Sequence, residues 1–396
     1  MPQDPASGAA RSLNTICEML AEAGFEVRAL ATTASERQNK SGASAYLQSL
    51  SIDLAIRRPD RSGPYRPQFV FHHRGIHYTL LDTADFSPSQ WEKVYGRHFD
   101  LLFDQELRDF QPDLLLTYGG SAADVRRRQR ARAAGASVVF GLRNLGYLVP
   151  GAFKHVDAIL STSQFVTSRY REAMGVESTP LPTPLDWDDV LAPERNPLFF
   201  TFVNPSPEKG LMFIARLLEE SSVRRPDVPF LVVEARGSAG LLAGAAITGG
   251  FDLRRHENIL VSAAVPKPRD LYAATRALLV PSVWEEPAGR VAPEALINGI
   301  PAMVSDRGGL SEMLHGGGFV LPIPAEVTPA SKKPPPAAAV EPWLELVFQL
   351  ADDENFYQQA SVRARAAGQN YARKALAPLY VDFFEAVLRG TIQRPQ

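Results

Sequence analysis

Cysteine is nearly absent from the sequence: Cys17 is the only one among 396 residues. A single thiol excludes an internal disulfide and a cysteine-rich metal site, and it is typical of a reducing, cytoplasmic setting. The formal net charge is only −2, so no overall field would attract nucleic acid or an acidic polymer. Apolar runs near the ~20 residues that span a bilayer are lacking, and the first residues, MPQDPASGAARS, do not resemble a signal peptide.

Short β-rich runs alternate with helical patterns in the second half of the chain. The length of 396 residues indicates two domains, at roughly 100–200 residues per domain. Apolar runs with helices between them and Gly or Pro at the joints predict parallel strands joined by crossover helices, which is the doubly wound arrangement. The predicted strands cover residues 198–203, 229–234, 258–263, 277–282, 302–306 and 318–322.

The first half of the chain shows the same alternation less clearly. A helical pattern ends at Gly24, and Arg74-Gly75 separates two alternating runs that predict a β-hairpin within residues 68–83. No apolar run precedes the first helix, so the opening strand of a doubly wound domain is missing. Further strands are predicted over residues 25–33, 113–119, 137–142 and 157–163. The predicted fold class is therefore α/β, with two doubly wound, Rossmann-like domains.

Proline marks the boundary between the two predicted domains. Residues 180–197 are rich in proline and have no periodicity, so we interpret them as a linker. A second such stretch, residues 324–342, is interpreted as an exposed loop. The predicted domains cover residues 1–187 and 198–375, and a final helical segment covers residues 376–396.

Acidic side chains follow one of the predicted strands. Glu285 and Glu286 lie in a loop between residues 277–282 and a helical pattern that contains Glu294. In open α/β sheets, ligands bind beyond the carboxyl ends of the strands. Carboxylates placed there can accept pairs of hydrogen bonds from the neighbouring hydroxyls of a sugar or a ribose. The alternative is that these acids only complement the helix dipole.

Pro293 indicates where that helix begins. Its missing N–H is harmless only within a first helical turn, so the helix is expected to start near Gly289 or Arg290. Arg290 and Glu294 would then share a face, four residues apart. The backbone N–H groups of Ala288, Gly289 and Arg290 would point out of the helix start, towards an anion or a polyol.

Two further loops are expected at the same edge of the sheet. Gly308-Gly309 follows the next strand, and Lys209-Gly210 stands where a helix begins after residues 198–203. A lysine there can neutralise a departing phosphate as a point charge.

These motifs resemble the retaining nucleotide-sugar glycosyltransferases of family 4, which have the GT-B fold. The matching pieces are EKG at 208–210, PSVWEEPAGRVAPEALINGIPAMVSDRGGLSE at 281–312 and the final helix, in the family's order and spacing. The resemblance is strong over the second domain and loose over the first. It implies two Rossmann-like domains that face each other across a cleft, with the final helix crossing back to the first domain.

The resemblance also implies roles for individual residues. Glu286 would hold hydroxyls of the donor sugar, Glu294 would bind the nucleotide ribose, and Lys209 would stabilise the β-phosphate as it leaves. The backbone of Pro287, Ala288 and Gly289 would touch the sugar and the diphosphate. The start of the first helix, Ser7-Gly8-Ala9, would match the glycine loop on the acceptor side.

Two positions depart from the family pattern. Asn204 stands where the family usually has an arginine, which leaves Lys209 without a cationic partner in its own loop, and Arg290 is a candidate substitute. Arg143 stands where the family often has a histidine that contacts the donor sugar. An arginine cannot act as a base at neutral pH, but it could hold a phosphate or an acidic acceptor.

Three other signals favour ordinary structure over a site. The motif Asp186-Trp187-Asp188 lies in the proline-rich linker, where a metal site is not expected. In a two-residue hairpin, His72 would face His77, which supplies only two zinc ligands. The basic segment 125–135 reads as a solvated helix face, and the sharper alternative is a surface for an anionic lipid or acceptor.

The predicted function is transfer of a sugar, with retention of configuration, from a nucleotide-sugar donor, taken to be UDP-linked, to an unidentified glycan, lipid or small molecule. Neither a metal nor a cofactor is expected. Lys209, Glu286 and Arg143 are the predicted catalytic residues. Neither nucleic acid nor a transmembrane segment is expected, and the protein is placed in the cytoplasm, with a peripheral membrane contact left open. The alternatives are a degenerate GT-B protein that binds nucleotide or serves as a partner subunit, and a nucleotide-sugar epimerase.

Overall fold

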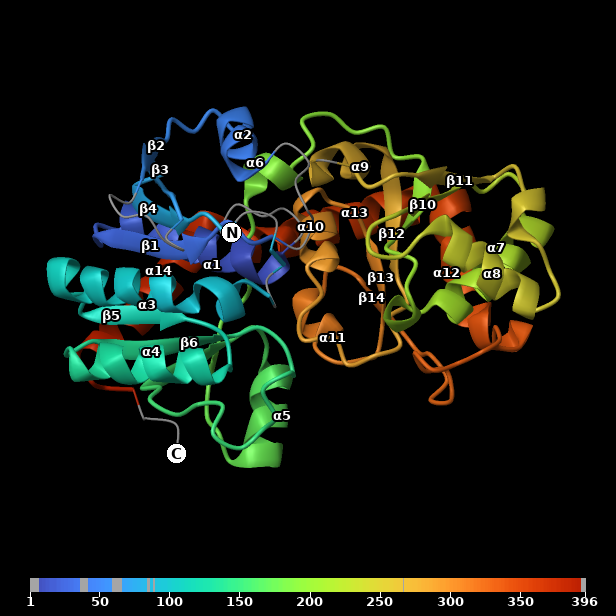
Figure 1. Cartoon of the computed structure of the whole chain (residues 1–396). Coiled ribbons are helices and arrows are strands. Elements are labelled where there is room, and N and C mark those ends of the chain that lie inside the picture. The colour runs from blue at the N-terminus through green and yellow to red at the C-terminus, as the bar shows by residue number, and fades with distance from the viewer. Residues whose placement is uncertain are drawn as a thin grey trace. The chain divides into compact units, whose positions relative to one another are not determined.

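The computed structural model describes residues 7–35, 42–58, 66–83, 86–87, 90–265 and 267–392. Contacts within the chain divide it into two compact units, which are labelled by element in Figure 1. Unit 1 contains the described residues of Met1–Thr162, Val166–Pro184 and Leu376–Gln396. Unit 2 contains those of Ser163–Phe165 and Leu185–Ala375.

The sheet of unit 2 has six parallel strands in the order β11-β10-β9-β12-β13-β14. Counted along the chain, this is the 3-2-1-4-5-6 order of dinucleotide-binding α/β folds. The six strands predicted for this half of the chain are all present, so that prediction is confirmed. Their bounds are β9 (Phe199–Val203), β10 (Phe230–Val233), β11 (Ile259–Ser262), β12 (Thr275–Val280), β13 (Ala302–Ser305) and β14 (Phe319–Leu321).

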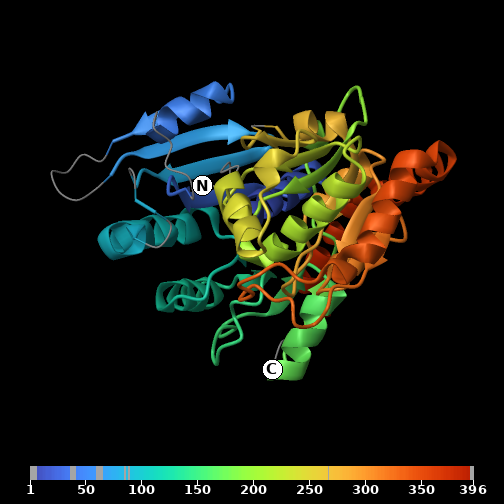
Figure 2. The same ribbon diagram turned by 90° about the vertical axis from the view of Figure 1, so that its right-hand side faces the viewer.

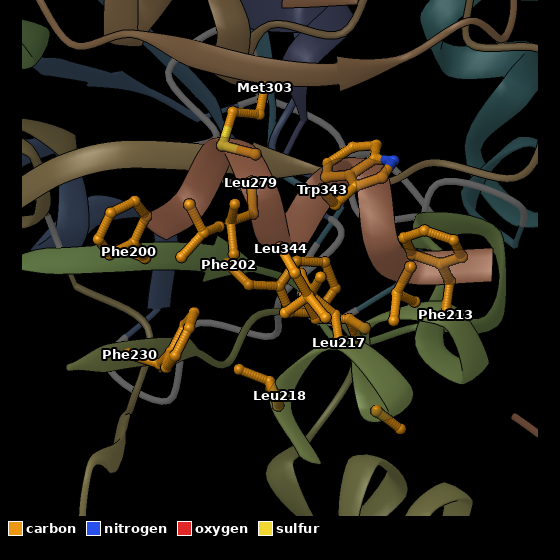
Figure 3. Close-up of a cluster of buried hydrophobic side chains, with 14 of the residues drawn as sticks. Phe200, Phe202, Phe213, Leu217, Leu218, Phe230, Leu279, Met303, Trp343 and Leu344 are labelled. Carbon is orange, nitrogen blue, oxygen red and sulfur yellow. The ribbon is translucent and has the colours of Figure 1, made fainter. Parts of the chain in front are cut away.

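Helices cover both faces of this sheet, because its central strands are apolar on both sides. Phe202 of β9 packs with Phe213 of α7 and Trp343 of α12 in one core, shown in Figure 3. Leu278 of β12 packs on the opposite face with Leu296 of α10. The helices of unit 2 are α6 (Trp187–Val190), α7 (Leu211–Arg224), α8 (Ala239–Thr248), α9 (Pro268–Ala274), α10 (Val291–Ile297), α11 (Leu310–Met313), α12 (Glu341–Asp352) and α13 (Glu354–Gly368).

Unit 1 contains two four-stranded sheets. One has the order β1-β4-β3-β2, with β1 parallel to β4 and the other pairs antiparallel, and the second is the parallel sheet β5-β6-β7-β8. The strand bounds are β1 (Val27–Thr32), β2 (Ala55–Arg57), β3 (Gln68–His73), β4 (Ile76–Leu81), β5 (Leu114–Thr117), β6 (Ser137–Leu142), β7 (Ala158–Ser161) and β8 (Thr179–Pro180).

The predicted hairpin is confirmed as β3 and β4. Its two turn residues, Arg74 and Gly75, both have positive φ, at 48° and 78°, which matches the turn geometry that two-residue hairpins favour. Leu47 of α2 packs in the same core as Phe71 of this hairpin, and Figures 1 and 2 show α2 beside these strands. The helices of unit 1 are α1 (Gly8–Glu22), α2 (Gly42–Ser49), α3 (Trp91–Phe110) and α4 (Ala122–Ala133), together with most of α5 (Gln164–Met174) and most of α14 (Arg373–Leu388).

The last helix, α14, contributes to the core of unit 1. Its buried residues Tyr380 and Phe384 pack with Ile16 of α1 and with Val139 of β6. The Tyr380 hydroxyl donates a hydrogen bond of 2.9 Å to the carbonyl of Pro182. Unit 1 is therefore completed by residues from the far end of the chain.

Some details of the sequence interpretation differ from the structure. The boundary between the two units, at Pro184 and Leu185, lies within the predicted linker 180–197, but this linker also contains the short helix α6, whose Val190 is buried. The exposed loop predicted for residues 324–342 ends early, since a 3₁₀ turn begins at Ala337 and α12 at Glu341. Helix α8 was not predicted from its run of alanines and glycines. The sequence predicts no strand before the first helix, and within the described residues α1 is the first element.

Candidate active site

Two neighbouring strands place Lys209 beside the loop that follows β12. Lys209 ends a 3₁₀ turn after β9, and Gly210 then adopts a φ of +87° before α7 begins. A Cβ on Gly210 would overlap the carbonyl of Pro281, so this close approach requires glycine. Ser282 joins the two loops, since its hydroxyl donates a hydrogen bond of 3.0 Å to the carbonyl of Glu208.

The Lys209 ammonium donates to Oε1 of Glu286 and forms an ion pair with it. Glu286 is only 4% exposed, whereas the Lys209 side chain is 29% exposed. The same Ser282 hydroxyl lies 2.9 Å from this carboxylate oxygen, so its single proton is shared between Glu286 and the Glu208 carbonyl. A buried carboxylate is tolerated only when it is paired and hydrogen-bonded, and these two donors supply that compensation.

Glu294 is held separately, in the first turn of α10. It is 6% exposed, and its Oε2 accepts a hydrogen bond of 2.8 Å from the hydroxyl of Tyr272. Its Oε1 lies 3.3 Å from a terminal nitrogen of Arg290. Helix α10 runs from Val291 with Pro293 in its first turn, so the predicted helix start and the predicted shared face of Arg290 and Glu294 are both confirmed.

Glycines allow the loop after β13 to lie directly against Glu286. Gly308 has a φ of +65°, and a Cβ there would overlap the backbone of Glu286. The Gly309 N–H donates a hydrogen bond of 2.7 Å to the Glu286 carbonyl. Gly289 has a φ of +74°, and a Cβ there would meet the end of the Leu310 side chain. The backbone around Glu286 is thus fixed from a second loop.

Pro287 and Ala288, the other predicted donor contacts, are both buried in the loop between β12 and α10. Their neighbour Glu285 is exposed. Of the two adjacent acids, only Glu286 is therefore drawn into the site.

Asn204 has its side chain engaged by the backbone. Its Oδ1 accepts a hydrogen bond of 2.8 Å from the N–H of Gly237, in the loop after β10. The residue has a φ of +66°, a left-handed conformation that asparagine tolerates better than most residues. Asn204 therefore ties together two loops at the carboxyl edge of the sheet.

The remaining predicted residues belong to unit 1. Ser7 is the N-cap of α1, with its hydroxyl accepting a hydrogen bond of 3.4 Å from the N–H of Ala10, and Gly8 and Ala9 form the first turn. Arg143 directly follows β6. Arg143 interacts with Tyr380, whose pKa is raised to about 12 by burial and is partly held down by this cation.

Two residues that support the acids were not singled out from the sequence. Ser282 lies at the end of a predicted strand, within the matching stretch 281–312 but without an assigned role, and Tyr272 lies in a predicted helix outside any motif. Their hydroxyls meet Glu286 and Glu294 only after the strands pair and the helices pack. A serine four residues before an acid was the one weak local signal available.

Comparison with known proteins shows which fold this chain has. No protein-family model and no curated protein sequence matches this chain. Solved structures do match it. Sucrose-phosphate synthase from Thermosynechococcus elongatus has a TM-score of 0.68 at 15% identity, covering 98% of this chain and 95% of its own.

Two further structures carry nucleotides. HepE from Anabaena in complex with UDP and glucose has a TM-score of 0.63 at 16% identity, covering 97% of this chain and 98% of its own. The catalytic domain of starch synthase IV from Arabidopsis thaliana, bound to ADP and acarbose, has a TM-score of 0.64 at 11% identity, covering 97% and 96%. This chain has the GT-B glycosyltransferase fold. The predicted fold class is confirmed.

Two of the other sequence signals have local structural roles. Asp186 caps α6 by accepting a hydrogen bond of 3.1 Å from the N–H of Asp188. His72 faces His77 across the hairpin as predicted, with ring nitrogens 3.1 Å apart. In the parts of the chain that the structure describes, no three His, Cys, Asp or Glu side chains gather as a metal site requires.

The basic helix, α4, is not simply a solvated face. Arg127 and Arg128 are buried, and Arg127 pairs with Glu92 and Asp100 of α3. Arg130 pairs with α3 as well, which reduces the positive charge available to an anionic surface. None of the helices within the described ranges is long and apolar enough to cross a membrane.

Proposed function

We propose that this protein is a retaining, metal-independent glycosyltransferase of the family 4 type, which transfers a sugar from a UDP-linked donor to an acceptor hydroxyl. The observation that carries the proposal is the Lys209–Glu286 pair at the carboxyl edge of the unit 2 sheet. That edge is where α/β sheets of this order bind nucleotides. The fold shared with glycosyltransferase structures along nearly the whole chain supports it.

In this proposal, donor binding changes the partners of the ion pair. Glu286 accepts hydrogen bonds from hydroxyls of the donor sugar, and Lys209 turns its ammonium towards the β-phosphate. The pair holds both groups in place beforehand, so little reorganisation is needed when charge develops on the leaving group. Ser282 stays on Glu286 and keeps the carboxylate oriented.

The remaining unit 2 residues hold the donor at its other end. Glu294, fixed by Tyr272 and Arg290, accepts hydrogen bonds from the ribose hydroxyls. The backbone of Pro287, Ala288 and Gly289 contacts the sugar and the diphosphate. Asn204 contributes indirectly, because its side chain holds the loops after β9 and β10 together.

The bond that breaks joins the anomeric carbon to the β-phosphate oxygen, and the bond that forms joins that carbon to the acceptor oxygen. The acceptor proton passes to the oxygen of the departing diphosphate, and the anomeric configuration is retained. Lys209 stabilises the departing charge, a task that a divalent cation performs in other enzymes. Arg143, in unit 1, is proposed to hold a phosphate or an acidic group of the acceptor, which is a glycan, a lipid or a small molecule.

The test compares Lys209→Ala with Lys332→Ala, which removes a lysine from an exposed loop. UDP-, GDP- and ADP-sugars are first screened by thermal shift, because a ligand of the native state raises its melting temperature. Transfer is then measured with and without EDTA, and the anomeric configuration of the product is read by NMR. We expect Lys209→Ala to lose at least about 100-fold in kcat, the size of an electrostatic transition-state contribution.

Three other outcomes of these experiments would contradict the proposal. Unchanged turnover in Lys209→Ala, with a folded protein, would remove Lys209 from the mechanism. Donor binding without turnover across an acceptor panel would favour a nucleotide-binding partner subunit. An altered sugar nucleotide formed without acceptor would favour an epimerase.

A further inference from the structure

Unit 2 contains a hollow of about 340 Å³ far from the candidate active site. It lies at the amino ends of β12 and β13, whereas Lys209 and Glu286 lie at the carboxyl edge of the sheet. Three segments form it: the stretch after α6, the C-terminal end of α10, and one face of α13. The lining residues are Leu191, Ala192, Pro193, Arg195, Pro197, Asn298, Tyr357, Gln358, Ser361 and Arg365.

Two arginines converge in this hollow. Arg195 donates hydrogen bonds of 2.8 Å to the carbonyl of Asn298 and 2.7 Å to the carbonyl of Thr275. Arg365 reaches the same Asn298 carbonyl from α13, at 3.4 Å. Two guanidinium groups that share one carbonyl oxygen must lie close together.

The lining residues provide no opposite charge. Arg195 and Arg365 are the only charged residues among them, and none is an Asp or a Glu. Glu354, one turn before Gln358, is engaged by Arg276 at 2.8 Å and by the Gln358 amide at 2.6 Å. Burial lowers the pKa of Arg195, and the nearby charge of Arg365 lowers it further, whereas Tyr357 raises it.

Capping of α10 explains only part of this arrangement. Arginines often donate to the last carbonyls of a helix and complement its dipole, and Arg195 does so. A cap requires neither a hollow nor a second, exposed guanidinium on a different helix. Ser361 and Gln358 also line the hollow, with the Ser361 hydroxyl donating a hydrogen bond of 2.7 Å to the Gly299 carbonyl.

We propose that this hollow binds a small molecule that carries a phosphate group, held between Arg195 and Arg365. Arginine is suited to this role because its planar fork binds phosphate oxygens in pairs. The volume lies at the lower end of the roughly 300–1,000 Å³ typical of ligand pockets. It therefore suits a sugar phosphate better than a complete nucleotide-sugar. This inference does not depend on the proposed activity.

The experiment titrates the full chain with inorganic phosphate and with glucose 6-phosphate by calorimetry, at constant ionic strength maintained with NaCl. It is carried out in the Lys209→Ala background, so that phosphate binding at the candidate active site is suppressed. We expect saturable binding in that background, tighter for the sugar phosphate than for inorganic phosphate.

Two matched pairs of variants test the location. Arg365→Gln and Arg363→Gln each remove one exposed arginine from α13, but only Arg365 lines the hollow. Gln358→Glu and Gln359→Glu each add one carboxylate to α13, and only Gln358 lines it. Arg365→Gln and Gln358→Glu should each weaken binding at least about tenfold, and their partners less than twofold.

Two results would overturn the proposal. One is equal weakening in both members of a pair, which would indicate general electrostatics. Another is the absence of saturable binding in the Lys209→Ala background. Circular dichroism of each variant confirms that the fold is intact, and Arg195 is left unchanged because it holds carbonyls of separate segments.

Discussion

The hydroxyl of Tyr272 donates a hydrogen bond of 2.8 Å to Oε2 of Glu294, and both side chains are buried. Tyr272 lies in α9 and Glu294 in α10, so the packing of these two helices fixes the position of the carboxylate. Hydrogen bonds to charged groups contribute about 1.5–3 kcal/mol. Tyr272 is therefore a positioning residue for the proposed ribose contact.

Tyr272→Phe should raise the KM for the nucleotide-sugar about tenfold or more and change kcat much less, because about 1.4 kcal/mol corresponds to a factor of ten. Steady-state kinetics with varied donor provides the measurement. The control is Tyr371→Phe, which removes a buried hydroxyl bonded to the Met313 carbonyl at 2.7 Å. If both variants change the donor KM equally, Tyr272 has no special relation to Glu294.

Gly308→Ala should distort the backbone of Glu286. The added methyl would overlap that backbone, and the residue has a φ of +65°. Gly316 is a close control, since its φ is +77° but no atom lies within 4 Å of its missing Cβ. A left-handed alanine costs roughly 1–2 kcal/mol in either place, and overpacking adds about 1–3 kcal/mol at Gly308 alone.

The measurement for this pair is urea unfolding together with donor binding. Gly308→Ala should be the less stable variant and should bind donor more weakly, whereas Gly316→Ala should lose stability only. Equal donor affinity in both variants would contradict the role given to Gly308.

Arg128→Met should destabilise the protein by about 3 kcal/mol or more, because it would leave buried carbonyls without their donor. Arg128 is completely buried and donates to the carbonyls of Gly119, Ala152 and Lys154, at 2.7, 2.7 and 3.1 Å. Arg126→Met, on the exposed side of the same helix, should change stability by less than about 0.5 kcal/mol. Urea midpoints compare the two, and similar midpoints would contradict the assignment.

Tyr380→Phe should make stability less sensitive to alkaline pH. Burial raises the pKa of Tyr380 from the ordinary value of 10.0 to about 12. The unfolded state therefore loses this proton at lower pH than the folded state, and the stabilisation present below pH 10 declines between about pH 10 and 12. One proton corresponds to about 1.4 kcal/mol per pH unit.

Urea unfolding at pH 8, 10 and 11 measures this dependence. The parent protein should lose stability more steeply above pH 10 than Tyr380→Phe does. Tyr118→Phe, at an exposed position, should retain the parent slope. Identical slopes for all three proteins would show that Tyr380 does not contribute.

Much of unit 2 could be predicted from local patterns. A strand buried on both faces needs an apolar run, and Pro293 fits only a first helical turn, so β12 and the start of α10 were predictable. The candidate acids and Lys209 were found because they stand at strand ends in a repeated strand–loop–helix pattern. The facing pair His72 and His77 followed from the two-residue turn.

The chain itself therefore determined which segments become strands and helices, and which charged residues stand at their ends, because these depend on near neighbours in the sequence. Only tertiary structure decided that Lys209 pairs with Glu286, that Tyr272 holds Glu294, and that unit 1 has two sheets. Tertiary packing also buries Arg128, although the sequence of its helix predicts a solvent-exposed face. These outcomes depend on side chains that meet only after distant segments pack, and a single sequence carries no local signal for such meetings.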